Sequence, residues 1–238
     1  KISVLNDPGF MTVRKTSGKN VDANIYLNLF SLNNLVAHAF NDKLKNTVVK
    51  MQNIGNWAEL DVNLKDDAIL LNGFSFSNDS LNNYLNIFLD QEAVDHKMNT
   101  ILPSNTAIFT VFGISNVEKY LKSYKSYLSQ QGKINQYQLF VDQQNNKYDI
   151  DLESFIKRQL EEEIGIIVTD IPSDSFEENT FVVMRTKSKS IAQNDIETLV
   201  SNIAKANGVN KSNYISDVRI DKETKYKVYK LPITNLFR

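Results

Sequence analysis

The sequence predicts an α+β protein in which one order of elements, β-α-β-β-α, occurs twice. Two observations predict this class. Hydrophobicity alternates with a period of two in several short segments, as in strands that bury one face, and follows a period near 3.6 in others, as in amphipathic helices. The two periods then occur in the same order in residues 20–92 and in residues 105–206.

The first copy begins with an alternating strand at residues 20–29. The period changes at Ser31, which we interpret as the N-cap of a helix extending to Phe40. Residues 56–76 are predicted to form a hairpin, because alternating segments flank a turn rich in Asp at residues 65–67. We expect the hairpin to direct four side chains towards helices: Leu60, Val62, Leu70 and Phe74. A second helix would then carry Leu81, Tyr84, Leu85, Phe88 and Leu89.

The second copy begins with a strand at residues 106–113. A capping box formed by Ser115 and Glu118 predicts the helix that follows. Its hairpin strands are expected at residues 164–170 and 180–186. Ser190 and Gln193 are predicted to cap the start of a last helix, and Gly208 is predicted to follow its end.

These elements divide the chain into two predicted domains. Residues 1–98 hold the first repeat with an N-terminal lead-in. Residues 99–238 hold the second repeat, with a helical insert at about 130–163 and a C-terminal hairpin of strands 214–220 and 225–231. With the next strand added, each repeat has a ferredoxin-like order, which places helices on one face of a mainly antiparallel sheet.

Composition excludes several classes of function. The net charge is −1, with 27 basic and 28 acidic residues, so no basic surface for nucleic acid is expected. The absence of Cys excludes disulfides, thiolate chemistry and cysteine-based zinc sites. No apolar run approaches the roughly 18 residues of a membrane span, so we expect no transmembrane segment in this chain. The start at Lys1, in an apolar stretch, indicates a fragment of a longer protein.

Three stretches carry a resemblance to a known family: "LNDPGFMTVRKTSGKNVDANIYLNL", "ILPSNTAIFTV" and "YDIDLESFIKRQLEEEIGIIVTD". They resemble a bacterial family catalogued only as a domain of unknown function, whose members are often exported or tethered to the cell envelope. The matching positions are Asp149, Asp151, Leu152, Phe155, Ile156 and Glu163. The chain departs from the pattern at residues 158–162, where "RQLEE" replaces a turn like Trp-Leu-Gly. The resemblance implies an exported, multi-repeat protein with a periplasmic or envelope-anchored location, and it transfers no catalytic residues.

The acidic run Glu161–Glu163 is the candidate metal site, with Glu161 and Glu163 as possible ligands. One interpretation is a cation site or an acid–base pair, which Asp149 and Asp151 could join. The other, which we favour, is a solvated helix end. Asp61, Asp66 and Asp67 fit a turn better than a calcium site, because they lack the EF-hand spacing. We expect no metal and no cofactor.

Histidine chemistry has little support in the sequence. His38 and His96 are the two histidines, and neither belongs to a metal-ligand spacing or a visible catalytic triad. We interpret His38 as a structural residue beside the apolar face of the first helix. The chain also lacks a Gly-rich phosphate loop and a G-x-S-x-G motif.

Trp57, Tyr26 and Phe74 are the candidate ligand-binding residues. Together with Phe30, they could form an outer aromatic sheet face that stacks on a sugar or a peptide. The alternative, which we favour, is packing against other parts of a longer protein.

The sequence therefore favours a non-catalytic interaction or scaffold region of an exported cell-envelope protein. Its partners would be other parts of its own longer chain or envelope proteins. A hydrolase with carboxylates assembled by the fold is one alternative, and a sugar- or peptide-binding module is another. A concave pocket with converging carboxylates of perturbed pKa would indicate the hydrolase.

Overall fold

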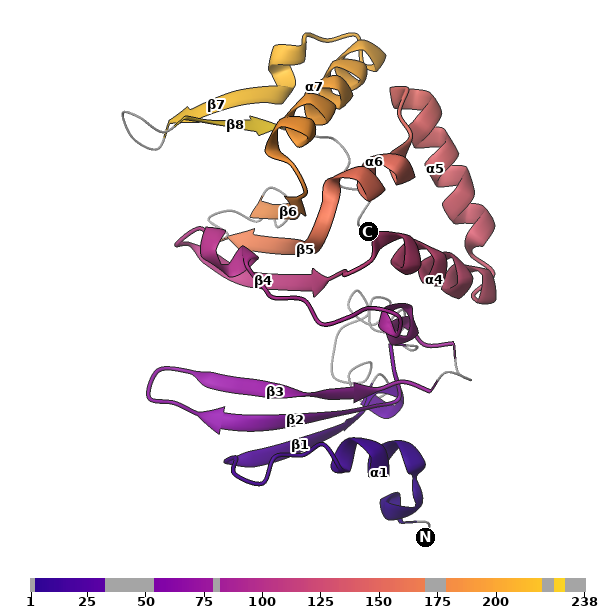
Figure 1. Cartoon of the computed structure of the whole chain (residues 1–238), viewed down its shortest axis with the longest axis vertical. Helices are drawn as coiled ribbons and strands as arrows, with labels where there is room; N and C mark the ends of the chain where they lie inside the picture. Colours follow the sequence, from indigo (N-terminus) through magenta and orange to yellow (C-terminus); the bar gives the residue numbers. More distant parts are fainter. Residues whose placement is uncertain (1–2, 33–53, 79–81, 170–178, 220–224, 230–238) are drawn as a thin grey trace, which may run out of the picture. The chain divides into compact units, whose positions relative to one another are not determined.

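The computed structural model describes residues 3–32, 54–78, 82–169, 179–219 and 225–229. Within these residues the chain forms three small antiparallel sheets together with helices, which confirms the α+β class (Figure 1). The chain divides into two compact units. Unit 1 consists of Lys1–Asp90 and Tyr120–Lys133, and unit 2 consists of Gln91–Lys119 and Ile134–Arg238.

Unit 1 contains an antiparallel sheet with the strand order β1-β2-β3. The strands are β1 (Ala23–Asn28), β2 (Trp57–Leu64) and β3 (Ile69–Phe76). β2 and β3 pair in one continuous register without a bulge. The Lys65 N–H donates a hydrogen bond of 2.8 Å to the Ala68 carbonyl and closes the turn between them. The predicted first strand and the predicted hairpin are both confirmed.

A short helix that we did not predict from the sequence packs on this sheet. α1 spans Pro8–Arg14, and Asp7 caps it by accepting hydrogen bonds from the N–H groups of Gly9 (2.8 Å) and Phe10 (3.1 Å). Asp before Pro is a strong helix start, because the carboxylate satisfies free N–H groups and Pro has no N–H to leave unpaired. The Asp7–Pro8 pair was therefore the overlooked signal.

α1 covers one face of this sheet, and the side chains expected against helices divide between its two faces. Phe10 packs against Tyr26 and Trp57, with ring centroids 5.2 Å from each. Side-chain alternation places Leu60 and Val62 on the opposite face, away from α1. The physical reason is that alternation shows which side chains share a face, whereas the covering of that face depends on the large apolar area of three aromatic rings.

Two further side chains expected against helices are exposed. Leu70 and Phe74 on β3 are 45% and 62% exposed. Both lie on the edge strand, where α1 buries little of the surface, so the hairpin is confirmed but the expected burial of these two side chains was wrong.

The second predicted helix of unit 1 is shorter than expected. A 3₁₀ helix spans Tyr84–Phe88, and residues 79–81, where we expected the helix to start, lie outside the described residues. The Asn83 side chain does not cap this helix, because its amide donates to the Asn56 Oδ1 at 2.6 Å instead. The helix predicted after Ser31 and the residue His38 fall mainly in residues 33–53, which also lie outside the described part of the chain.

α4 (Val117–Gln130) is confirmed, but its cap differs from the predicted capping box. Asn116 Oδ1 accepts the Lys119 N–H at 2.9 Å, so Asn116 occupies the capping position. The Ser115 hydroxyl accepts the Glu92 N–H at 2.9 Å instead, because a segment distant in sequence competes for it. The later part of α4 belongs to unit 1, where Tyr127 packs on Tyr84 with ring centroids 5.8 Å apart.

Unit 2 contains a second antiparallel sheet, with the strand order β4-β5-β6. The strands are β4 (Thr106–Gly113), β5 (Leu160–Thr169) and β6 (Thr180–Thr186). β4 and β6 have the predicted bounds. β5 begins at Leu160 rather than at residue 164, so Glu161, Glu162 and Glu163 lie in a strand and not at a solvated helix end. The favoured interpretation of the acidic run was therefore wrong.

The helices of unit 2 build its core. α5 (Ile134–Tyr148), α6 (Leu152–Gln159) and α7 (Lys189–Ala206) pack together. Tyr148, Leu199 and Ile203 form the buried cluster. The two helices expected in the insert are thus present.

The end of α7 and the hairpin beyond it were predicted more accurately than its start. Gly208, with φ +65°, follows the end of α7 as predicted. Ser188 is the N-cap position in place of Ser190, and Gln193 hydrogen-bonds to Glu197 within the helix at 3.3 Å. The last hairpin consists of β7 (Ile215–Arg219) and β8 (Lys225–Tyr229).

The strand pairing differs from the ferredoxin-like order. In both three-stranded sheets the first strand pairs with the first strand of the following hairpin. A ferredoxin-like unit instead inserts the second hairpin strand between the other two. Hydrophobic periodicity identifies strands but not their neighbours, so the pattern could not separate these arrangements.

Among the described residues, no helix has both the length and the apolar character needed to cross a lipid bilayer.

The α7 core gives a stability prediction with a control on the same helix. Ile203 is 0% exposed, so Ile203→Ala should lower the free energy of unfolding by about 2–5 kcal/mol through lost burial and a residual cavity. Ile191 is 49% exposed, so Ile191→Ala should cost less than about 1 kcal/mol. Chemical denaturation followed by circular dichroism compares the two. Equal losses would contradict this assignment of the core face.

Candidate functional site

Unit 1 contains a cleft of about 570 Å³, a size typical of small-ligand sites. It lies where one end of each strand of the sheet meets the start of α1. We call it the unit 1 cleft, and it is lined by Asp7, Pro8, Gly9, Asn28, Phe30, Gly55, Asn56, Trp57, Phe76, Asn78, Asn82, Asn83 and Gln131. A smaller cleft of about 180 Å³ shares Asn82 and Asn83 with it and reaches Ser123 and Gln130 of α4.

Gly9 allows α1 to form a wall of this cleft. A Cβ at position 9 would lie 2.8 Å from Trp57 Cδ1 and 3.3 Å from Phe76 Cδ1. Only a glycine permits the backbone to approach both rings this closely. The position of Trp57 in the cleft therefore depends on a residue of the helix that we did not predict.

Amide side chains in the cleft are held by hydrogen bonds. Asn56 Oδ1 accepts from the Asn83 amide at 2.6 Å and from the Asn78 N–H at 3.0 Å. Asn28 Oδ1 accepts the Ser31 N–H at 2.9 Å. These bonds fix the side chains before any ligand arrives, which reduces the entropy lost on binding.

The unit 1 cleft carries almost no charge. Among its described lining residues, Asp7 alone is ionisable. Its Oδ1 already accepts the two N–H groups at the start of α1. The remaining lining offers aromatic faces together with amide donors and acceptors, so the cleft suits a neutral ligand better than an ion.

The aromatic candidates from the sequence fall in different places. Trp57 and Phe30 line the cleft, and Phe30 is 66% exposed. Tyr26 packs under α1, where its hydroxyl forms a hydrogen bond of 2.7 Å with the Ser17 hydroxyl. Phe74 stays exposed on β3. Sequence reasoning missed Phe76 and the asparagines of the cleft, although the Asn-rich segment "SNDSLNNYLN" was a visible signal.

β2 carries a buried glutamate, Glu59, on the sheet face that α1 covers. Glu59 is 0% exposed, and neither of its carboxylate oxygens has a hydrogen-bond partner among the described residues. Burial, and then the neighbouring Asp61 carboxyl group, raise the pKa of Glu59 above its ordinary 4.5, against the opposing effect of the Asn24 amide. Asp61 differs because it accepts the Gly18 N–H at 2.8 Å, which lowers its pKa, as does the amide of Asn24.

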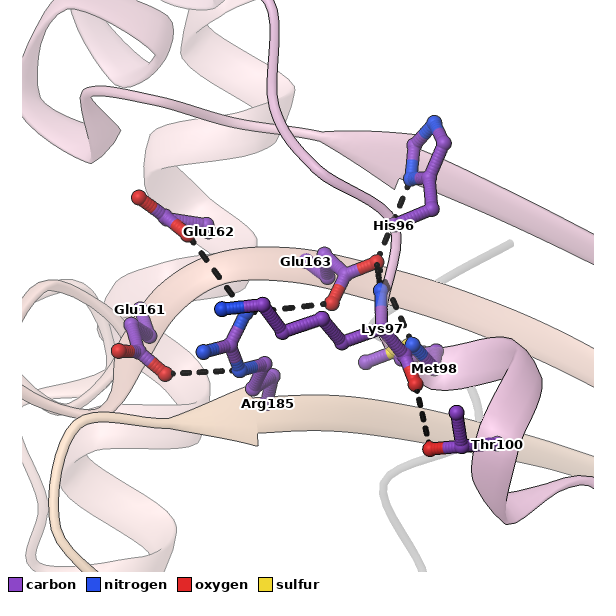
Figure 2. Close-up of polar contacts among 8 residues, drawn as sticks. All are labelled: His96, Lys97, Met98, Thr100, Glu161, Glu162, Glu163 and Arg185. Atoms are coloured by element: carbon purple, nitrogen blue, oxygen red, sulfur yellow. Dashed lines mark hydrogen bonds and ion pairs between the residues drawn. The ribbon is translucent and has the colours of Figure 1, made fainter.

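A second buried glutamate is the centre of a polar network in unit 2 (Figure 2). Glu163 on β5 is also 0% exposed. Its Oε1 accepts the backbone N–H groups of Lys97 (2.9 Å) and Met98 (3.5 Å) and lies 3.3 Å from His96 Nδ1. Thr100 supports this turn by donating its hydroxyl to the Lys97 carbonyl at 2.7 Å.

Arg185 on β6 joins the three glutamates of the acidic run. Its Nε lies 2.9 Å from Glu161 Oε2, and its Nη1 lies 3.6 Å from Glu162 Oε2 and 3.5 Å from Glu163 Oε2. The solvated interpretation fails most clearly for Glu163, which is buried, and all three carboxylates share one guanidinium (Figure 2). Arg185 lies on β6, which pairs with β5. The sequence analysis did not identify it as a partner because it is more than 20 residues away in the chain.

Hydrogen bonds decide the charge state of Glu163. Burial by itself raises the pKa of Glu163, but the N–H groups of Lys97 and Met98, and then His96, outweigh it and hold the pKa below the ordinary 4.5. Glu163 is therefore buried as a carboxylate with partners on both sides. The network is an ionic connection between β5, β6 and the segment before β4.

The described residues contain no group of three or more His, Asp or Glu side chains arranged to hold a metal ion. Glu161 and Glu163 point to Arg185, and His96, whose side chain is 53% exposed, contacts Glu163. Asp151 caps α6 by accepting the Ser154 N–H at 3.0 Å, and Asp149 adopts a positive φ of 50° between α5 and α6.

Comparison with known proteins identifies no relative: no protein-family model matches the chain, and neither a curated protein nor a solved structure matches it.

The Glu163 network predicts a destabilised variant. Glu163→Gln removes the charge that pairs with Arg185 and should lower the free energy of unfolding by about 1–3 kcal/mol near neutral pH. A lowered folded pKa gives stability that is present above the unfolded value of 4.5 and is lost as pH falls through the folded value. The deficit of the variant should therefore shrink in acid. Thermal unfolding across this pH range measures it, and a deficit that grows in acid would contradict the network.

For Glu59, replacement by Gln is expected to stabilise the protein at neutral pH rather than destabilise it. Its raised pKa gives stability that is present below 4.5 and is lost as pH rises through the folded value. Glu59→Gln should therefore raise the melting temperature of unit 1 by a few degrees at neutral pH and leave it unchanged in acid. Hydrogen exchange of the β1–β3 amides reports on this unit directly. Loss of protection in the variant at neutral pH would show that Glu59 has a stabilising partner.

Proposed function

We propose that this chain is a non-catalytic interaction region of an exported cell-envelope protein, and that the unit 1 cleft is its binding site. The observation that carries the proposal is the composition of the cleft. Trp57, Phe76 and Phe30 supply aromatic surface, fixed amides supply hydrogen bonds, and one carboxylate supplies the only charge of the described lining. The ligand is an uncharged molecule with apolar faces and hydroxyl or amide groups.

This ligand chemistry follows from the two kinds of lining residue. Aromatic rings bind apolar faces, such as the C–H face of a sugar ring or an aliphatic side chain. Side-chain amides present a donor and an acceptor together and so pair with hydroxyl groups and with peptide groups. Glycans and extended peptides share this chemistry. The smaller adjoining cleft, which shares Asn82 and Asn83, favours a ligand long enough to occupy both.

The hydrolase alternative has less support at this cleft. Acid–base catalysis needs two titratable groups that reach the substrate. Asp7 caps α1, and the perturbed pair Glu59 and Asp61 does not line the cleft. Glu59 is also buried beneath the sheet's covered face, where a substrate in the cleft does not reach it.

The export and repeat parts of the proposal have separate support. The resemblance to an envelope-associated family supports export, and the shared strand order of the two sheets supports two copies of one structural repeat. Fractionation of cells that produce the complete protein tests the first part. Recovery of that protein only in the cytoplasm would contradict export without affecting the cleft.

Binding can be measured with a natural probe, because Trp57 is the only tryptophan in the chain and lines the cleft. Titration with neutral oligosaccharides in one arm and uncharged peptides in the other should change the tryptophan emission in one arm. Phe30→Ala should weaken that binding roughly tenfold, as expected for the loss of an aromatic contact.

The control for this experiment is Phe181→Ala, which removes another exposed phenylalanine, on β6 of unit 2. It should leave both binding and the emission of Trp57 unchanged. Equal loss in both variants, or no response to either ligand class, would overturn the proposed site.

A further inference from the structure

β3 is an edge strand that lacks the usual protection against pairing with another strand. It has β2 on one side and no strand on its other side among the described residues. Its sequence, "ILLNGFSF", contains no charge and no Pro, and its register with β2 has no bulge. Natural proteins use these three devices to block edge-to-edge association.

Apolar side chains are exposed on both faces of this edge. Ile69 and Leu71 on one face are 67% and 53% exposed, and Leu70 and Phe74 on the other are 45% and 62% exposed. β1 and β4 are also uncharged edges. β1 exposes one large apolar residue, Ile25, and the pairing of β4 with β5 is interrupted by a bulge between Thr106 and Ile108. β3 is therefore the better template for an added strand.

The backbone direction shows which groups are available. The carbonyls of Ala68 and Phe76 accept hydrogen bonds from the side of β2. Because backbone groups alternate in direction along a strand, the even-numbered residues of β3 face β2. The N–H and C=O groups of Ile69, Leu71 and Ser75 then point to the outer edge.

We propose that β3 pairs with β3 of a second copy of this chain, antiparallel and centred on Asn72. A two-fold axis at Asn72 places Leu70 opposite Phe74 of the second copy, and Phe74 opposite its Leu70. Residues opposite one another in this register share a face, as a continuous sheet requires. Asn72 meets the same residue of the second copy across the axis, where two amides can hydrogen-bond.

The self-complementarity of the strand selects this partner. An uncharged strand paired with itself opposes no like charges, and each apolar residue on the Leu70 face meets another apolar residue. The contact is isologous, so it closes at two copies rather than continuing into a filament. It joins two three-stranded sheets into one of six strands. The proposal does not depend on the ligand of the unit 1 cleft.

Analytical ultracentrifugation of the 238-residue chain, over a concentration series reaching the millimolar range, should show a species of twice the 27.2 kDa monomer mass. Asn72→Lys places two like charges directly opposite each other and should raise the dissociation constant of the dimer by roughly tenfold or more. Asn72→Asp should do the same. A mixture of the two variants should recover the dimer, because opposite charges then meet across the axis.

Ile108→Lys on β4 is the control, since Ile108 is an exposed apolar residue of another uncharged edge. This variant should remain dimeric. Position 72 is exposed, so both of its variants should keep the melting temperature of the parent, which confirms that they are folded. A monomeric parent, a dimer that survives both single variants, a mixture that stays monomeric, or dissociation by Ile108→Lys would each overturn the proposal.

Discussion

The packing of Phe10 against Tyr26 and Trp57 organises unit 1. It attaches α1 to the sheet and determines the sheet face on which α1 lies. The same contact buries Glu59 and brings Gly9 against Trp57 and Phe76, so the wall of the unit 1 cleft follows from it. Burial of three aromatic side chains outweighs the cost of one poorly satisfied carboxyl group, because each ring buries a large apolar area.

The two fully buried glutamates show that polar neighbours, rather than burial alone, determine the direction in which the pKa of a carboxyl group shifts. Glu163 accepts the backbone N–H groups of Lys97 and Met98 and lies beside His96, so its charged form is favoured. Glu59 has no hydrogen-bond partner among the described residues and lies near the carboxylate of Asp61, so its charged form is disfavoured. Equal removal from water therefore leads to opposite pKa directions in the two units.

The two units also present different chemistry for recognition. Unit 1 combines an amide-lined, nearly uncharged cleft with an uncharged strand edge, and both favour contacts made through hydrogen bonds and apolar surface. Unit 2 relies on ionic contacts. Besides the Arg185 network, Glu197 on α7 pairs with Lys227 of β8 at 2.8 Å, and hydrogen bonds from that lysine and from Gln193 lower the pKa of Glu197 to about 2. Salt should thus affect unit 2 more than unit 1.

The sequence by itself determined the local elements. Strands such as β4 and β6, the β2–β3 hairpin and the body of α4 follow from hydrophobic period and turn chemistry, which act over a few residues. The start of α1 was also encoded, in Asp7 and Pro8, and was overlooked. The candidate site was only partly visible, since Trp57 was named but its partners Phe76 and Gly9 were not.

Tertiary structure decided what those elements contact. Ser115 does not cap α4, because the N–H of Glu92 takes its hydroxyl. Glu163 is buried and ionised rather than solvated, because Lys97 and Arg185 come from other segments. The order of strands within each sheet and the sheet face on which α1 lies were likewise decided by tertiary structure. Periodicity shows which side chains share a face. Which segment packs on that face depends on residues far away in the chain, because the apolar area that the two buried surfaces remove from water decides the arrangement.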